Sequence, residues 1–182
     1  MPSEWSLSYP RYMIDDGCTH VAAGQVLKWI VEFWTEGAIG FSAEKVRTAS
    51  EVGDHKYRIT GEVVYLSDTA SVIDFGLRAI SSRDILPRNS KQGDFVSGEV
   101  RLGLPLCTEV IPEEILASLE YEWEVETVLA DLTPYVEVSG QSGGRVFYRD
   151  GSQPKYQEVK STDAVHAEAY ILRCLSRPFG HL

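Results

Sequence analysis

The stretch from Leu119 to Thr127 reads LEYEWEVET, and it decides the fold class of this chain. Hydrophobic side chains alternate in it with four glutamates: Glu120, Glu122, Glu124 and Glu126. Successive side chains of a β-strand point to opposite faces, so the pattern predicts a strand with one apolar face and one row of carboxylates. We therefore expect Tyr121 and Trp123 to lie inside the protein.

Negative charge is concentrated in the second half of the chain. The 182 residues carry a formal net charge of -10. Residues 1–91 hold 12 acidic and 10 basic residues, a net charge of -2, whereas residues 92–182 hold 15 and 7, a net charge of -8. Phosphate backbones and anionic lipids repel such a molecule, which argues against nucleic acid and membrane surfaces as partners.

The composition is that of a globular protein, with 43% hydrophobic residues. We expect a single β-rich domain over residues 1–182, in which residues 1–25 can form an N-terminal extension. The three cysteines, Cys18, Cys107 and Cys174, are odd in number and far apart, which does not suggest a disulfide framework. Together with the lack of a signal-like segment at residues 1–5, this predicts a cytoplasmic protein.

Strand patterns dominate the remaining sequence. The expected strands cover residues 26–34, 57–66, 71–80, 94–103, 119–130, 135–139, 145–149 and 165–175. One short helix is expected over residues 112–118, because Pro112 suits the first position and two glutamates suit the first turn. The tripeptide at residues 74–76, DFG, is interpreted as part of a strand because the other motifs of a kinase are lacking.

A weak internal repeat bears on the architecture. Residues 59–63, ITGEV, resemble residues 96–100, VSGEV, and each copy has a glycine inside a predicted strand. Such glycines mark bulges or bends at the corners of barrels. The element order β-β-β-α-β-β is that of an OB-type Greek-key barrel. We therefore expect an all-β fold, a small Greek-key or OB-like barrel or sheet with one short helix.

The carboxylate row is the main candidate site. It predicts a non-catalytic module that engages a basic protein surface, for example an immunity- or inhibitor-type protein, because fixed charge on a sheet favours encounter with such a partner. The alternative is that the row is solvated or is answered by cations of adjacent strands, such as Arg58, Arg101 or Lys160. A linear row converges poorly on calcium, so no metal is expected there.

A second hypothesis is an OB-like binder of single-stranded nucleic acid or another ligand. Such binders stack bases on aromatic side chains within a basic groove. The candidate aromatic residues are Trp5, Tyr9, Tyr12, Trp29 and Trp34. The candidate basic residues are Lys56, Arg58, Arg78 and Arg83. Aromatic residues on a sheet more often belong to the core, which weighs against this hypothesis.

A third hypothesis is a metal-dependent hydrolase built on the turn from Asp15 to His20, which also holds Asp16 and Cys18. This turn lacks the paired Cys or His spacing of zinc sites, so an ordinary Asp-Gly turn is favoured.

The serine pattern G-x-S-x-G occurs at residues 140–144, followed by Asp163 and His166. A strand is expected after Ser142, where the serine elbow of hydrolases requires a helix, so a hairpin turn is favoured. Glycine-rich nucleotide-binding motifs are also lacking, and no cofactor is expected.

Overall fold

Strands dominate the structure, which confirms the predicted all-β class. The computed structural model describes residues 4–105, 113–139 and 145–178. Helical segments in this part are short: α1 (Arg11–Asp15), η1 (Arg83–Ile85) and α2 (Glu113–Leu116). The strands are β1 (Trp5–Pro10), β2 (Val26–Trp29), β3 (Glu32–Trp34), β4 (Gly40–Phe41), β5 (Thr48–Gly53), β6 (Lys56–Leu66), β7 (Ala70–Asp74), β8 (Arg78–Ser82), β9 (Phe95–Gly103), β10 (Tyr121–Asp131), β11 (Tyr135–Ser139), β12 (Arg145–Arg149), β13 (Tyr156–Val159) and β14 (Ala169–Pro178).

Five of these strands close into a small barrel. β9, β3, β8, β7 and β6 pair in that order, and a further pairing of β6 with β9 closes the ring. The pairing of β3 with β8 is parallel, whereas the other four are antiparallel. β5 extends the ring at β6, and β4 pairs with β9. The predicted small barrel is therefore confirmed.

The internal repeat falls on the two strands that close the ring. β6 and β9 pair antiparallel, with Ile59 opposite Gly98. A Cβ atom on Gly61 would come within 2.5 Å of Ile73 Cγ2, and one on Gly98 within 2.6 Å of Ile39 Cδ1. Both glycines therefore allow close packing of barrel side chains against the backbone.

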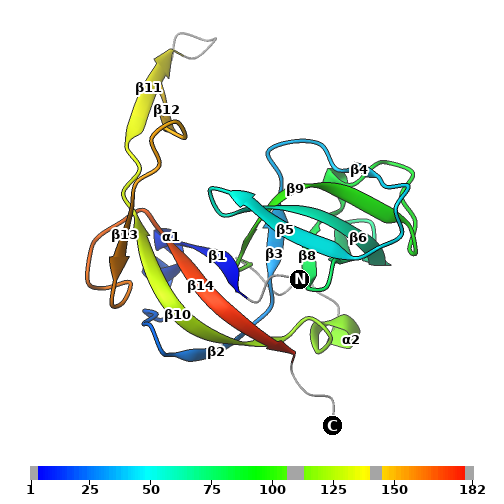
Figure 1. Cartoon of the computed structure of the whole chain (residues 1–182), viewed down its shortest axis with the longest axis horizontal. Coiled ribbons are helices and arrows are strands. Elements are labelled where there is room, and N and C mark those ends of the chain that lie inside the picture. The colour runs from blue at the N-terminus through cyan, green and yellow to red at the C-terminus, as the bar shows by residue number, and fades with distance from the viewer. Residues whose placement is uncertain (1–3, 106–112, 140–144, 179–182) are drawn as a thin grey trace.

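The acidic strand lies outside the barrel, and the expectation that it forms one of the five barrel strands is wrong. β13, β10, β14 and β1 lie side by side, and β2 also pairs with β10. A short parallel pairing of β1 with β9 joins this sheet to the barrel. Figure 1 shows the two resulting lobes and the hairpin β11–β12, which projects from the lobe that contains β10.

Two expected strands are each divided in the structure. Residues 26–34 form β2 and β3, which belong to different lobes. Residues 71–80 form β7 and β8, because Gly76 adopts a positive φ of 98° and its N–H donates to Asp74 Oδ1 over 3.0 Å. Of the tripeptide at residues 74–76, Asp74 ends β7, and Phe75 and Gly76 belong to the turn that follows it. β1, β4, β5 and β13 lie in segments for which no strand is expected from the sequence.

One hydrophobic cluster extends through both lobes. Trp123 belongs to it with 0% of its surface exposed, and its indole Nε1 donates to the carbonyl oxygen of Trp29 over 3.0 Å. Tyr121 is half-buried, and its hydroxyl accepts a hydrogen bond from the backbone N–H of Arg78 over 2.9 Å. The prediction for Trp123 is confirmed, and Tyr121 lies at the margin of the core.

Candidate functional site

The carboxylate row follows the face of β10 that points away from the core. Trp123 and Val125 are fully buried, so Glu122 and Glu124 point to the opposite face, where both are half-buried. The register of β10 shifts between Val125 and Thr127, and Glu126, at this bulge, is exposed. The row therefore begins just before the strand, at the half-buried Glu120, and ends at a bulge.

The strands on either side of β10 determine which residues pair in register with the row. Glu122 pairs in register with Lys28 of β2 and with Arg177 of β14. Glu124 pairs in register with Val26 and Leu175.

The cations that the sequence suggested as neighbours of the row lie elsewhere. Arg58 and Arg101 belong to the barrel, where Arg58 forms an ion pair with Glu99 and Arg101 with Glu36 and Asp54. The backbone carbonyl of Lys160 accepts a hydrogen bond from Ala23.

The turn at residues 15–20 does not assemble a metal site. Asp15 forms an ion pair with Arg11 over 3.1 Å, and His20 Nδ1 lies 3.2 Å from Thr162 Oγ1. Within the described ranges, no group of three or more His, Cys, Asp or Glu side chains is arranged to hold a metal ion.

The predicted serine turn lies outside the described residues at Ser142. The segment that follows it forms β12 rather than a helix. Asp163, the second candidate, accepts a hydrogen bond from Ser161, and His166 is exposed.

The residues of the predicted aromatic and basic groove are mostly engaged within the fold. Trp5 and Tyr9 are buried, and Trp29 packs against the core. Each of the candidate basic residues forms an intramolecular contact: Lys56 with Glu36, Arg58 with Glu99, Arg78 with Asp74, and Arg83 with the carbonyl oxygens of Pro87 and Arg88.

Sequence reasoning missed a groove of about 660 Å³ between the barrel and the second sheet. Its barrel wall includes the two-residue turn between β5 and β6, where Asp54 and His55 both have positive φ angles of 50° and 56°. Type I′ hairpin turns require positive φ at both central positions and usually carry Asn or Gly there. Histidine adopts positive φ angles more readily than most residues other than glycine, and the His55 side chain is buried.

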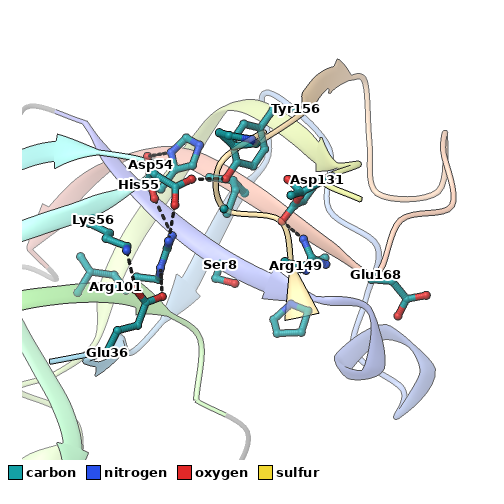
Figure 2. Close-up of a pocket in the computed structure, with 18 of the residues that line it drawn as sticks. Ser8, Glu36, Asp54, His55, Lys56, Arg101, Asp131, Arg149, Tyr156 and Glu168 are labelled. Atoms are coloured by element: carbon teal, nitrogen blue, oxygen red, sulfur yellow. Dashed lines mark hydrogen bonds and ion pairs between the residues drawn. The ribbon is translucent and has the colours of Figure 1, made fainter. Parts of the chain in front are cut away.

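Asp54 connects the two walls of the groove (Figure 2). Its carboxylate accepts a hydrogen bond from the Tyr156 hydroxyl of β13 over 2.7 Å and one from Arg101 over 2.5 Å. Burial favours a higher pKa for Asp54, but these hydrogen bonds outweigh it and hold the pKa below its usual value. Burial and the hydrogen bond to Asp54 raise the pKa of Tyr156 to about 12. Asp54 is therefore a carboxylate at neutral pH and Tyr156 a neutral phenol.

The imidazole ring of His55, the residue after Asp54, packs against Tyr156 and Ser6. It is 8% exposed, its Nδ1 lies 3.1 Å from Ser6 Oγ, and its ring meets the edge of Tyr156 at 4.8 Å between centroids. Burial is the main cause that lowers the pKa of His55, and the nearby carboxylate of Glu51 only partly offsets it. The imidazole is therefore neutral at pH 7.

The opposite wall carries its own ion pair. Arg149 donates to the mostly buried carboxylate of Asp131, and its guanidinium also lies over the ring of Tyr135, 5.4 Å from the centroid. Glu168, which is exposed, lines the same end of the groove (Figure 2). Tyr12 of α1 lines the groove as well.

Comparison with family models, with characterised proteins and with solved structures finds no match for this chain. Over the described residues, none of the helices has the length and apolar character needed to cross a membrane.

Proposed function

We propose that this chain is a non-catalytic binding module that engages a basic protein surface through the carboxylate row of β10, as an immunity- or inhibitor-type protein does. One observation carries the proposal: Trp123 and Val125 are fully buried and fix the strand whose opposite face presents Glu122 and Glu124. Carboxylates held on an ordered strand speed encounter with a basic surface and disfavour acidic competitors. The net charge of -10 also favours encounter with a basic surface.

We infer different roles for the members of the row from their positions in the sheet. Glu122 pairs in register with Lys28 of β2, and opposite charges in register stabilise strand pairing by about 0.2–1 kcal/mol. We therefore assign Glu122 mainly to the sheet. Glu124 has Val26, 60% exposed, as its neighbour on the edge strand, and Glu126 is exposed at the bulge. This end of the row combines charge with exposed apolar surface, as the contact region of a protein partner requires.

A capture experiment with matched baits tests the proposal. Three baits are immobilised: the wild-type chain, a Glu124→Gln/Glu126→Gln variant and a Glu44→Gln/Asp68→Asn control. Mass spectrometry identifies the proteins that each bait retains from an extract of the native host. The control removes the same charge from exposed barrel positions. We expect a basic protein that the wild type and the control retain at low salt and that the row variant loses. Identical retention by all three baits, or retention of acidic proteins only, would refute the docking role.

A further inference from the structure

The floor of the groove is formed by two paired strands, β1 and β14. In β1 the odd-numbered residues are buried in the core, whereas Ser6, Ser8 and Pro10, which alternate with them, line the groove. Ala169 and Ile171 of β14 pair in register with Pro10 and Ser8 and line the groove as well. Most of these side chains are short, which leaves room above the sheet for a ligand. The volume of about 660 Å³ is within the range of roughly 300–1,000 Å³ that is typical of small-molecule sites.

Both floor strands are interior strands of their sheet. β1 lies between β14 and β9, and β14 lies between β10 and β1. An extended peptide that is recognised through its main chain adds to an unpaired strand edge. Because the floor offers no such edge, a ligand in the groove is recognised by side chains.

One aromatic ring fits closely against the backbone at this floor. Gly103 of β9 pairs in register with Ser8. A Cβ atom on Gly103 would come within 2.8 Å of Trp34 Cζ3 and within 2.9 Å of Trp34 Cη2. The six-membered ring of Trp34 therefore occupies the place that a side chain at residue 103 would need. Trp34 is half-buried and lines the groove, so part of its indole surface is available to a ligand.

The charged side chains of the groove compensate each other. Three lining cations each form an ion pair with a lining carboxylate: Lys56 with Glu36, Arg101 with Glu36 and Asp54, and Arg149 with Asp131. The remaining lining carboxylate, Glu168, interacts electrostatically with Arg149. Each of these charges thus has a partner of opposite sign, which favours an uncharged ligand. The net charge of -10 disfavours phosphates and other anions further.

Two polar groups of the groove retain hydrogen-bonding capacity. Within the described residues, the Ser8 hydroxyl forms no hydrogen bond, and the Arg149 guanidinium donates one, from Nη1 to Asp131. A guanidinium carries five N–H donors, and a hydroxyl both donates and accepts. Figure 2 shows Ser8 between the wall that carries Arg101 and the wall that carries Arg149. A ligand with several hydroxyl groups matches this set, because each of its hydroxyls can also donate and accept.

The aromatic rings of the groove belong to separate elements. Tyr12 of α1 and Tyr135 of β11 are 44% and 50% exposed, and they line the groove together with Trp34 of β3. These three rings do not pack against one another in the described part of the chain, so they form no clamp for a single flat base. Separate rings suit a ligand with several apolar faces in succession. The C–H groups of a sugar ring form such a face and pack on the electron-rich face of an aromatic ring.

We propose that the groove binds a neutral oligosaccharide, with one sugar ring stacked on Trp34 and its hydroxyl groups hydrogen-bonded to Ser8 and Arg149. The exposed rings of Tyr12 and Tyr135 contact further sugar units along the groove. This site is separate from the carboxylate row, because none of the four glutamates of the row lines the groove. Saccharide binding therefore goes beyond the docking role of β10 and does not depend on it.

NMR titration of the isotope-labelled full chain tests the proposal with three neutral trisaccharides: maltotriose, cellotriose and triacetylchitotriose. The comparators are trigalacturonate as an acidic saccharide, adenosine as a nucleoside, and acetyl-Gly-Tyr-Gly-amide as a peptide. We expect at least one neutral trisaccharide to shift the indole signal of Trp34 and the amide signals of Ser8 and Tyr135. None of the comparators should do so.

Variants of the floor locate the binding. For the trisaccharide that gives the largest shifts, Ser8→Ala should weaken binding about fivefold through the lost hydrogen bond. Trp34→Ala should weaken it about tenfold through the lost stacking surface. Ser50→Ala and Phe41→Ala are the matched controls and should bind like the wild type, because both residues are exposed and neither lines the groove. Thermal melting verifies that each variant is folded, and Ser8→Ala, which removes a single oxygen atom, decides if Trp34→Ala unfolds.

Three results would overturn the inference: no shifts with any of the neutral trisaccharides, shifts of equal or larger size with a comparator, or equal losses in the floor variants and their controls. The Glu124→Gln/Glu126→Gln variant separates this site from the docking face. It should bind the trisaccharide like the wild type, so the docking role can fail while saccharide binding stands.

Discussion

At the scale of the residue, Trp123 anchors the strand that carries the candidate docking face. Its full burial agrees with the sequence pattern. Trp123 alternates with glutamates, so it lies on the apolar face of the strand, which packs against the core. The structure adds a feature that the alternation does not reveal, the hydrogen bond from the indole to Trp29.

Replacing Trp123 by alanine should lower the free energy of unfolding by about 3–5 kcal/mol, because it removes a buried aromatic ring and leaves a cavity. Urea unfolding followed by circular dichroism measures this loss. Phe41→Ala is the matched control, since Phe41 is 55% exposed and its loss should be small. Equal losses in the two variants would mean that the burial of Trp123 contributes nothing special to stability.

His55 makes stability depend on pH. Its pKa in the folded protein lies below the unfolded value of about 6.5, so the unfolded state binds the proton more strongly. The stability contribution is complete above pH 6.5 and decreases as the pH falls below it. Glu51 and Asp54 oppose this shift, whereas burial, Arg173 and Arg101 produce it.

His55→Asn should reduce the loss of stability between pH 7.5 and pH 5, because asparagine does not titrate and tolerates the positive φ of the turn. Urea midpoints at several pH values for the wild type and the variant provide the comparison. Parallel pH profiles would show that other groups cause the wild-type decrease.

At the scale of the element, ten of the fourteen strands that the structure describes lie in segments that the sequence pattern predicted as strands, whereas β1, β4, β5 and β13 do not. The pattern also missed the breaks within residues 26–34 and 71–80. The break within residues 71–80 arises where the carboxylate of Asp74 binds the N–H of Gly76, and the flanking Phe75 and Leu77 are fully buried on both sides of the turn. Because hydrophobic residues continue through the turn, the sequence pattern did not indicate it. An Asp two residues before a Gly was the only signal for it.

The groove could not be predicted because its residues come from distant segments. Asp54, Arg101 and Tyr156 meet only through the pairing of β6 with β9 and the position of β13. One local signal existed: the two polar residues between Gly53 and Lys56 suit a hairpin turn. That signal locates a turn, but it does not indicate what the turn faces.

Gly61→Ala tests the closure of the barrel. The added Cβ would approach Ile73 Cγ2 to 2.5 Å and the backbone oxygen of Asp74 to 3.0 Å, so we expect a loss of about 1–3 kcal/mol in urea unfolding. Gly40→Ala in β4 is the control, because no atom lies within 4 Å of its added Cβ. A loss in the control as large as that in Gly61→Ala would disprove the role of close packing at Gly61.

At the scale of the whole molecule, two β lobes share one hydrophobic cluster and enclose a charged groove. The carboxylate row and the groove occupy the lobe with β10 and its border with the barrel (Figure 1). The overall charge could be derived from the sequence alone. The pairing of Glu122 with Lys28 and Arg177 could not, since it depends on the order of strands in the sheet.

The association rate of the captured basic partner tests the docking role most directly. Stopped-flow measurements at low and high salt compare the wild type, Glu124→Gln/Glu126→Gln and the Glu44→Gln/Asp68→Asn control. Because charges at the rim of an interface govern encounter, the row variant should associate several-fold more slowly at low salt and depend less on salt, with little change in dissociation. The control should match the wild type. An unchanged association rate in the row variant, or an equal decrease in the control, would contradict the assignment of the row as the docking face.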